Sequence, residues 1–586
     1  MREKKAAIRV SEVSEVSMIS DPAAFIEIAS AIEAAGSVAL DVETFGSRKN
    51  DGLNPWRGDI RLLSLKVEGS APWLIDLQST GYDLGVLSTA LASVLVIAHN
   101  AKFDALWFAV KCGVRIRRVF CTLTAARLLS AGTRPGNDLD KCLERYLGIK
   151  PATDHSTSDW GGMFLTDDQL AYAARDVAHL HALYDVLTLK LEQSNLGDVA
   201  ELEMELLPVV VAMEQAGMAV DRAKLESIRD QAKAESEMQT AALRDLLGDR
   251  QLNVSSPAQL QAALTKAGVA VANTNEETLK ASGDERFVPI ILAHRSAEKT
   301  AQQAQSLIEC IAADGCIHGR FDPTGTATGR FSSKEPNLQN IGRGPLRECF
   351  VAPEGSKLVV ADYSQIELRA AAAIAGETKM IEAYRRGEDL HRGTAAAVLG
   401  KTVDAVTKED RQLAKAVNFG LLYGQSAPGL VKYAASSYGV TLPEDDAKEI
   451  RAKFFRTYGS LRQWHGESHR QAEQGVSEVR TVLGRRRLIP QEASAWERFT
   501  ALVNTPVQGG CADGMKRALV QLAGTLPPSA RIISTVHDEI IVEAPEHEAE
   551  DIRHTVEAAM VEAMAALFPQ VPVEVEANVC ASWGEK

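Results

Sequence analysis

Two aspartates lie in sequence contexts where a carboxylate is unexpected unless it takes part in chemistry. Asp362 ends an apolar run that is typical of a buried strand. Asp538 lies between the β-branched runs 531–536 and 540–543, as in a hairpin. Two carboxylates in one sheet repel each other unless a divalent cation neutralises them, and carboxylates that leave room for phosphate suit Mg²⁺. The pair therefore predicts a two-metal site for nucleotidyl transfer, whereas the tripeptide 537–539 alone would indicate a polar turn.

Between the two aspartates, basic and aromatic residues recur every four positions, at Arg411, Lys415, Phe419 and Tyr423. Steps of four turn a helix about 40° beyond a full turn, so these side chains form one slowly winding face about 18 Å long. Arg and Lys at one end suit a triphosphate, Phe suits stacking on a base or sugar, and Tyr suits the templating end. The competing interpretation is an amphipathic core stripe, but Arg and Lys beside Phe and Tyr make a poor core.

A second set of carboxylates lies in the first third of the chain. Asp41 and Glu43 are two residues apart on a strand-like run and so share one face. Tyr172 and Asp176 are four apart and share one helix face. Asp104 follows a His-Asn pair at a suitable interval. A lone Asp-x-Glu is a weak signal because most such pairs lie on surfaces, but the whole set predicts a second metal site.

Composition narrows the class of protein. A length of 586 residues suggests about four domain-sized units. The net charge of −14 does not exclude a nucleic-acid binder, because a basic cleft can lie inside an acidic shell, and the Arg run 485–487 is a candidate patch. Eight cysteines without Cys-x-x-Cys spacing indicate neither zinc nor disulfides and fit a reducing cytosol. The basic start 1–5 has no apolar stretch behind it, so we expect no export signal and no membrane span.

The order of expected elements changes along the chain. Up to about residue 195, strand-like runs alternate with helical patterns, which predicts an α/β layout. Residues from about 200 to 315 are mainly helical, with breaks at glycines and at a Ser-Ser-Pro triplet. Strands return from about 316 and are interrupted by a helical stretch from about 377 to 435. We find no internal repeat and no low-complexity linker.

Taken in order, residues 358–369, 411–424 and 532–542 resemble motifs A, B and C of the family A DNA polymerases, the family of bacterial DNA polymerase I. The carboxylate set before them resembles the DEDD-type 3′–5′ proofreading exonucleases of the subclass with Tyr. The resemblance implies a multidomain α/β protein in which a ribonuclease H-like exonuclease domain precedes a right-hand polymerase. Its expected parts are an exonuclease domain at 1–195, a helical thumb at 196–320, an antiparallel-sheet palm at 321–376 and 441–586, and helical fingers at 377–440.

The resemblance also implies roles at the polymerase site. Metal would be held by Asp362, Tyr363 and Asp538, and Lys415 would donate a proton to pyrophosphate. Glu367 would cover the position of a ribose 2′-hydroxyl. The expected nucleotide-binding residues are Gln365, Glu367, His391, Arg411, Lys415, Phe419 and Tyr423.

Two stretches resemble the segments with which the family binds duplex DNA. They are the primer–template segment at 328–340 and the minor-groove helix at 504–509. Every correct base pair presents N3 or O2 acceptors in the minor groove, so Arg, Gln and Asn can check pair geometry there without reading sequence. Residues 481–487 are expected to contact the DNA backbone. The family often has Arg where this chain has Thr500, and the basic loop after Asn340 is shortened. The expected DNA contacts are Arg330, Asn337, Gln339, Asn340, Arg485, Asn504, Gln508 and His537.

At the exonuclease site, the resemblance implies that four carboxylates hold two Mg²⁺ or Mn²⁺ ions and that Tyr172 orients the attacking water. The expected ligands are Asp41, Glu43, Asp104 and Asp176. A catalytically dead domain kept as a scaffold is the alternative, but such a domain would be expected to lack some of these carboxylates.

The expected function is template-directed extension of a primer 3′ end with dNTPs, with two Mg²⁺ ions in each site and 3′–5′ proofreading, in DNA replication. Expected partners are primer–template DNA and dNTPs, with a monomeric enzyme, no membrane and unspecified replication accessory proteins. No 5′-nuclease domain and no large thumb insertion are evident, which favours a phage-like enzyme in the cytoplasm of a bacterium or phage-infected host. A single-subunit RNA polymerase is disfavoured by Glu367 and by the proofreading domain, and a non-catalytic DNA-binding protein by the intact metal carboxylates.

Overall fold

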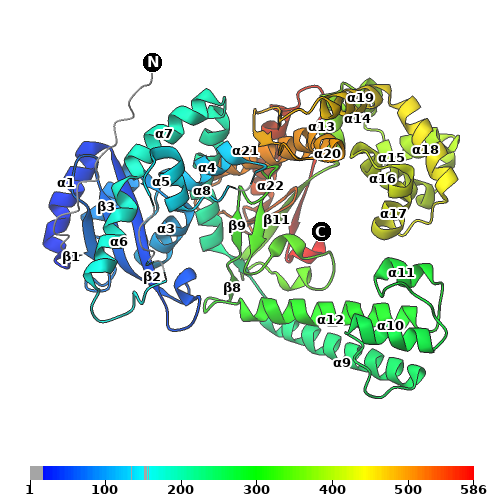
Figure 1. The fold of residues 1–586 in the computed structure, drawn as a ribbon, viewed down its shortest axis with the longest axis horizontal. Helices are drawn as coiled ribbons and strands as arrows, with labels where there is room; N and C mark the ends of the chain where they lie inside the picture. The colour runs from blue at the N-terminus through cyan, green and yellow to red at the C-terminus, as the bar shows by residue number, and fades with distance from the viewer. Residues whose placement is uncertain (1–17, 134, 151–154, 156) are drawn as a thin grey trace.

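The structure is a computed structural model that describes residues 18–133, 135–150, 155 and 157–586, so the basic start 1–5 lies outside the described residues. Two sheets lie one after the other along the long axis, and two groups of helices extend from the second sheet and face each other (Figure 1). Among the described residues, we find no helix that combines the length and the apolar character needed to span a bilayer.

The first sheet has six strands in the order β1-β4-β3-β2-β5-β6. Its central strand, β2 (Ser37–Phe45), pairs antiparallel with β3 (Asp59–Lys66) and parallel with β5 (Leu95–Ala98). Both faces of β2 are buried around Leu40, because helices cover the sheet. The remaining elements are β1 (Met18–Ile19), β4 (Trp73–Asp76), β6 (Arg118–Cys121), α1 (Phe25–Ala35), α2 (Val86–Ser93), α3 (Ala101–Trp107), α4 (Thr122–Ser130), α5 (Leu139–Leu147), α6 (Asp167–Ala178) and α7 (Leu180–Gln193). The α/β layout predicted for this part of the chain is confirmed.

A helical region follows, as the sequence predicts. The long helix α8 (Gly197–Ala216) packs against both α3 and β14 and so joins the two sheet regions. The pair α9 (Arg222–Leu247) and α12 (Val288–Glu309) forms the lower arm in Figure 1. The short helices α10 (Pro257–Lys266) and α11 (Glu276–Ala281) lie near its tip.

The second sheet is antiparallel, with the order β14-β15-β11-β16. Its centre is β11 (Ser356–Tyr363), which pairs with β15 (Glu539–Pro545) and β16 (Val575–Cys580). β14 (Arg531–Val536) and β15 form the predicted hairpin. The helices α21 (Gly510–Thr525) and α22 (Ala549–Ala565) pack against each other, and α22 covers β11 and β16. The C-terminal end of β11, which carries Asp362, and the β14–β15 turn, which carries Asp538, therefore lie at the same end of the sheet.

The upper arm in Figure 1 is helical, as predicted for residues 377 to 435, but the helices continue beyond that range. The key helix α16 (Lys408–Leu422) begins with a capping box formed by Thr407 and Asp410. The helix ends at Leu422, and two residues later Gly424 has φ of 79°. An added Cβ at Gly424 would lie 2.4 Å from the ring of Phe499, so only glycine fits. The other helices are α13 (Ile366–Ala375), α14 (Thr378–Arg385), α15 (Leu390–Leu399), α17 (Ala427–Tyr438), α18 (Glu444–Thr457), α19 (Gly459–Glu473) and α20 (Ala495–Asn504).

Two candidate active sites

The strand register of the second sheet brings the two predicted aspartates together. Asp362 is paired with Glu539 across β11 and β15, and Asp538 immediately precedes Glu539 in the hairpin turn. The turn is tight because His537 takes a left-handed conformation with φ of 57°. The backbone N–H of Tyr363 donates to the carbonyl of Asp538 at 3.1 Å, which locks the turn to the end of β11. The carboxylates therefore share one end of the sheet, as the sequence predicted.

This arrangement is electrostatically unfavourable without a cation. Burial, and next the charge of Asp362, raise the pKa of Asp538 to about 7. Glu539, which the sequence analysis did not assign to the site, adds a third carboxylate and raises that pKa further. Its place directly after Asp538, at the start of a strand, is the signal that could have pointed to it. Carboxylate oxygens crowded in this way are a donor set suited to a hard divalent cation.

A pocket of about 300 Å³ adjoins Asp538, which lines it together with Arg330, Gln339, Glu367 and His537, among others. One wall residue of this pocket is Glu367 on α13, whose carboxylate accepts a hydrogen bond from the hydroxyl of Tyr423 and pairs with the guanidinium of Arg330. Three segments far apart in the sequence thus hold one carboxylate at the wall of the pocket. The sequence predicted each of these residues but not their mutual contact.

The predicted face of α16 is present, with Lys415 and Phe419 half-buried. At its start, Arg411 donates to Asp389 at 2.7 Å on the rim of a second pocket of about 210 Å³, which Gln365 also lines. His391 lies behind this face rather than on it, because its side chain is only 1% exposed and its Nδ1 bonds to Asn418 Nδ2 at 2.9 Å. Burial, and next Arg411, lower the pKa of His391 to about 4, so the ring is neutral. A phosphate contact by His391 would require the ring to turn outward.

The residues predicted to contact DNA differ in their exposure and in their hydrogen bonds. Gln339 accepts from the backbone N–H of His537 at 2.8 Å and donates to the carbonyl of Thr535 at 2.8 Å, so it supports the turn that carries Asp538. Asn337 and Asn340 are exposed beside it. Asn504 ends α20, and Gln508 lies in the π-helical turn Thr505–Gly509 that follows, with both side chains half-buried.

The contact with the DNA backbone predicted for Arg485 is wrong. Its side chain is only 3% exposed, its Nε donates to Asp513 at 2.6 Å, and its guanidinium pairs with Glu203 at 2.6 Å. Lys516 also pairs with Glu203, which makes a buried cluster of two cations and two anions between α8 and α21. A buried cation that already has carboxylate partners is unavailable to phosphate. Arg485 therefore stabilises the packing of these helices.

The four carboxylates predicted in the first sheet region also come together. Oxygens of Asp41, Glu43 and Asp176 lie within 4.8 Å of one another, and in the described part of the chain no other such group of acidic, His or Cys side chains occurs. Asp104 on α3 is buried and accepts from the backbone N–H of Val42 at 3.2 Å. Burial raises the pKa of Asp104 to about 8. Burial also raises the pKa of Asp41 well above its ordinary value, and Glu43 is the next cause.

Tyr172 completes this second site. It lies on α6 one turn before Asp176, and its hydroxyl hydrogen-bonds to the Asp176 carboxylate. Burial, and next the charge of Asp176, raise the pKa of Tyr172, so the phenol keeps its proton. The ring of Trp160 lies 6.2 Å from the Tyr172 ring and helps to fix its orientation. The site thus combines acidic oxygens with one neutral hydroxyl donor.

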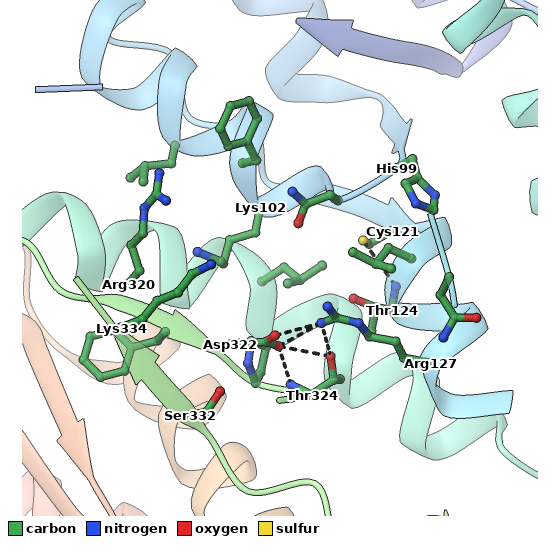
Figure 2. Close-up of a pocket in the computed structure, with 18 of the residues that line it drawn as sticks. His99, Lys102, Cys121, Thr124, Arg127, Arg320, Asp322, Thr324, Ser332 and Lys334 are labelled. Carbon is green, nitrogen blue, oxygen red and sulfur yellow. Dashed lines mark hydrogen bonds and ion pairs between the residues drawn. The ribbon is translucent and has the colours of Figure 1, made fainter. Parts of the chain in front are cut away.

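A cleft of about 620 Å³ separates the first sheet region from the strands β9 (Arg320–Asp322) and β10 (Ser332–Lys334). Figure 2 shows that Arg127 reaches across it, and its Nη1 bonds to both oxygens of Asp322 at 3.0 and 2.9 Å and to Thr324 at 3.0 Å. Lys102, on the same side as Arg127, pairs with the buried Glu214 at 2.7 Å. The segment that carries Arg330 is therefore tied to the domain that carries the second site.

Family models match both parts of the chain. The model described as DNA polymerase family A matches residues 222–585, and the model described as 3′-5′ exonuclease matches residues 16–192. Each candidate site has carboxylates inside the corresponding match.

Curated relatives and a solved structure agree with these matches. DNA polymerase I of Aquifex aeolicus is 33% identical over 93% of this chain and 95% of its own length. DNA polymerase I of Pseudomonas aeruginosa is 34% identical over 84% of this chain, but the chain spans only 56% of that relative. A solved structure described as the POL domain of Pol1 from M. smegmatis in complex with DNA primer-template and dNTP has a TM-score of 0.83 at 29% identity, and the match covers 97% of this chain and 99% of that one.

Proposed function

The chain belongs to DNA polymerase family A and carries a 3′-5′ exonuclease domain, and from this premise we propose that it extends a primer 3′ end on a template and removes 3′-terminal nucleotides. The predicted family and the predicted α/β fold class are confirmed, and the relatives are DNA polymerases rather than RNA polymerases or non-catalytic proteins. The observation that carries the proposal is the register that pairs Asp362 with Glu539 and so places Asp538 beside Asp362. The test is extension of a primed template with dNTPs or with rNTPs in the presence of Mg²⁺. A chain that adds neither would contradict the proposal.

Enzymes of this family depend on divalent metal, and the crowded carboxylates fit such a cation because burial and mutual repulsion disfavour their charged forms. We propose that Asp362, Asp538 and the backbone of Tyr363 hold two Mg²⁺ ions. When bound, these ions would activate the primer 3′-hydroxyl and neutralise the leaving pyrophosphate. Arg411 and Lys415 then bind the triphosphate from α16, and Lys415 supplies a proton to the leaving pyrophosphate.

At the other site, we propose that two Mg²⁺ or Mn²⁺ ions are held by Asp41, Glu43, Asp104 and Asp176. Oxygens of three of these carboxylates lie within 4.8 Å of one another, and the charge of Asp104 acts on Asp41. When bound, the ions would generate the attacking hydroxide from water. Tyr172 keeps its phenolic proton and orients that water by a hydrogen bond. Hydrolysis of the terminal phosphodiester at this site would release a nucleoside monophosphate and leave a 3′-hydroxyl on the shortened strand.

We also propose the primer–template path. Two of the proposed duplex contacts, Arg330 and His537, line the polymerase pocket, and Gln339 supports the turn that carries Asp538. The other proposed duplex contacts are Asn337, Asn340, Asn504 and Gln508. We propose the exonuclease domain at 1–195, the thumb at 196–320, the palm at 321–376 and 441–586, and the fingers at 377–440; the bound between thumb and palm falls within β9 (Arg320–Asp322). A monomeric enzyme in DNA replication, a cytoplasmic location and a phage origin stay predictions.

Glu367→Ala is expected to raise the ratio of ribonucleotide to deoxynucleotide incorporation by roughly tenfold or more, because it removes the carboxylate at the wall of the pocket. The measurement is single-nucleotide extension with a dNTP and the matching rNTP at equal concentrations. Glu382→Ala is the control, since Glu382 is exposed on α14 and pairs only with Arg386 among the interactions described. An unchanged ratio in a Glu367→Ala enzyme that still extends primers would show that Glu367 does not select the sugar.

Phe419→Tyr is expected to make the enzyme sensitive to dideoxynucleotides, whereas the parent enzyme resists them. With Phe, only the 3′-hydroxyl of the incoming nucleotide fills the polar space beside the ring, and an unmade polar contact costs about 1–3 kcal/mol, or roughly tenfold to hundredfold in rate. Tyr would place its own hydroxyl there. The measurement is a primer-extension ladder at fixed ratios of dideoxy to deoxy substrate. Equal termination by both enzymes would mean that Phe419 does not face the sugar.

A further inference from the structure

A cation of the chain itself already lies among the polymerase carboxylates. The ammonium of Lys586 is 3.0 Å from Asp362 Oδ2 and 3.2 Å from Glu539 Oε2. Its side chain is 9% exposed, so this is an enclosed contact and not a surface pair. The charge of Lys586 also acts on Asp538, which makes it a neighbour of all three acids. No local sequence pattern marks Lys586 as part of a site.

The segment just before Lys586 is anchored by backbone hydrogen bonds. The N–H of Ala352 donates to the carbonyl of Ala581 at 2.8 Å, and the N–H of Trp583 donates to the carbonyl of Phe350 at 2.9 Å. Trp583 is 1% exposed, and its indole N–H donates to Glu539. The chain is therefore held three residues before Lys586, and the flexible side chain of Lys586 lets its ammonium move between Asp362 and Glu539.

An ammonium and a divalent ion cannot both neutralise the same Asp362 oxygen at low cost, because two cations at that separation repel each other strongly in a half-buried site. Lys586 can leave Asp362 and keep its contact with Glu539, so metal can bind without leaving the ammonium unpaired. If the Lys586 ion pair were purely structural, it would not respond to metal. If the ammonium competes with metal for Asp362, it must weaken metal binding.

We propose that Lys586 is a built-in counter-ion of the polymerase site. Its ammonium neutralises Asp362 and Glu539 when no divalent metal is bound, and it withdraws from Asp362 to Glu539 when metal enters. Lys586 thereby sets the metal concentration at which this site fills. In the metal-free site, its charge reduces the repulsion among the carboxylates. This inference rests on the proposed function, in that it takes Asp362 to be a metal ligand.

The test is direct Mn²⁺ titration, followed by the electron paramagnetic resonance signal of free Mn²⁺. All variants carry Asp41→Ala and Glu43→Ala, so that the exonuclease site does not contribute. Lys586→Met is expected to bind Mn²⁺ roughly threefold to thirtyfold more tightly than this background, the range for loss of one partly buried ion pair. Lys586→Arg keeps the charge and should stay near the background. Lys357→Met is the matched control, because Lys357 lies on β11 but pairs with the exposed Glu546 at 3.1 Å.

The outcomes separate the inference from the proposed function. Equal or weaker Mn²⁺ binding by Lys586→Met overturns the inference, because a competitor must weaken metal binding. Adding Asp538→Ala should remove the titrated site and so assign it. If the background itself binds no Mn²⁺, the proposed polymerase metal site fails and the inference falls with it. Lys586→Gln, which keeps a polar tip without the charge, gives the same test if the Met variant does not fold by circular dichroism.

Discussion

Asp538→Ala is expected to lower nucleotide addition by at least about a thousandfold, equivalent to roughly 4 kcal/mol of transition-state stabilisation, and to leave 3′-end degradation at the parent rate. The reason is that Asp538 is a proposed metal ligand in the palm, and the polymerase site shares no residue with the exonuclease site. The measurement is primer extension with a correct dNTP, run beside degradation of a labelled single strand without dNTPs.

The same variant should fold at least as well as the parent. Because burial raises the pKa of Asp538, the folded state disfavours its charged form, and at neutral pH removal of the carboxylate should not lower the melting temperature in the absence of metal. Asp551→Ala, an exposed acid on α22 behind the same sheet, is the matched control and should leave extension unchanged. Extension by Asp538→Ala within tenfold of the parent rate would remove Asp538 from the catalytic site.

The double variant Asp41→Ala with Glu43→Ala is expected to show the reverse pattern, with 3′-end degradation reduced at least about a thousandfold and extension intact. Asp41 and Glu43 contribute two of the three carboxylates whose oxygens lie within 4.8 Å of one another, so their removal leaves too few ligands for a metal pair. The measurement is the rate of nucleoside monophosphate release from a single strand.

Asp168→Ala is the control for the double variant, since Asp168 is exposed in the first turn of the helix that carries Tyr172 and Asp176. Its degradation rate should match that of the parent. If the double variant still degraded single strands at the parent rate, the exonuclease assignment would be wrong. If it lost extension as well, the two sites would be coupled through the contacts that join the domains, such as Arg127 with Asp322.

Local sequence was enough to predict the acids and the elements that hold them. Alternation in a strand puts Asp41 and Glu43 on one face whatever the rest of the chain does. A polar break between two β-branched runs predicts the hairpin that carries Asp538, and repeats of four predict the face of α16. These features follow from backbone geometry within a dozen residues, which is why short patterns are sufficient to recognise them.

Tertiary structure alone decided the electrostatic environment of each charge. Arg485 belongs to an arginine run that is typical of a DNA-binding patch, yet it is buried against Glu203 and Asp513. No local pattern marks those partners, because they come from the helices α8 and α21. The contacts of Lys586 with Asp362 are likewise set by how the segment after β16 returns to β11. The type of a side chain fixes its charge, but burial and the distance to its partners fix what that charge does, and both depend on residues far away in the sequence.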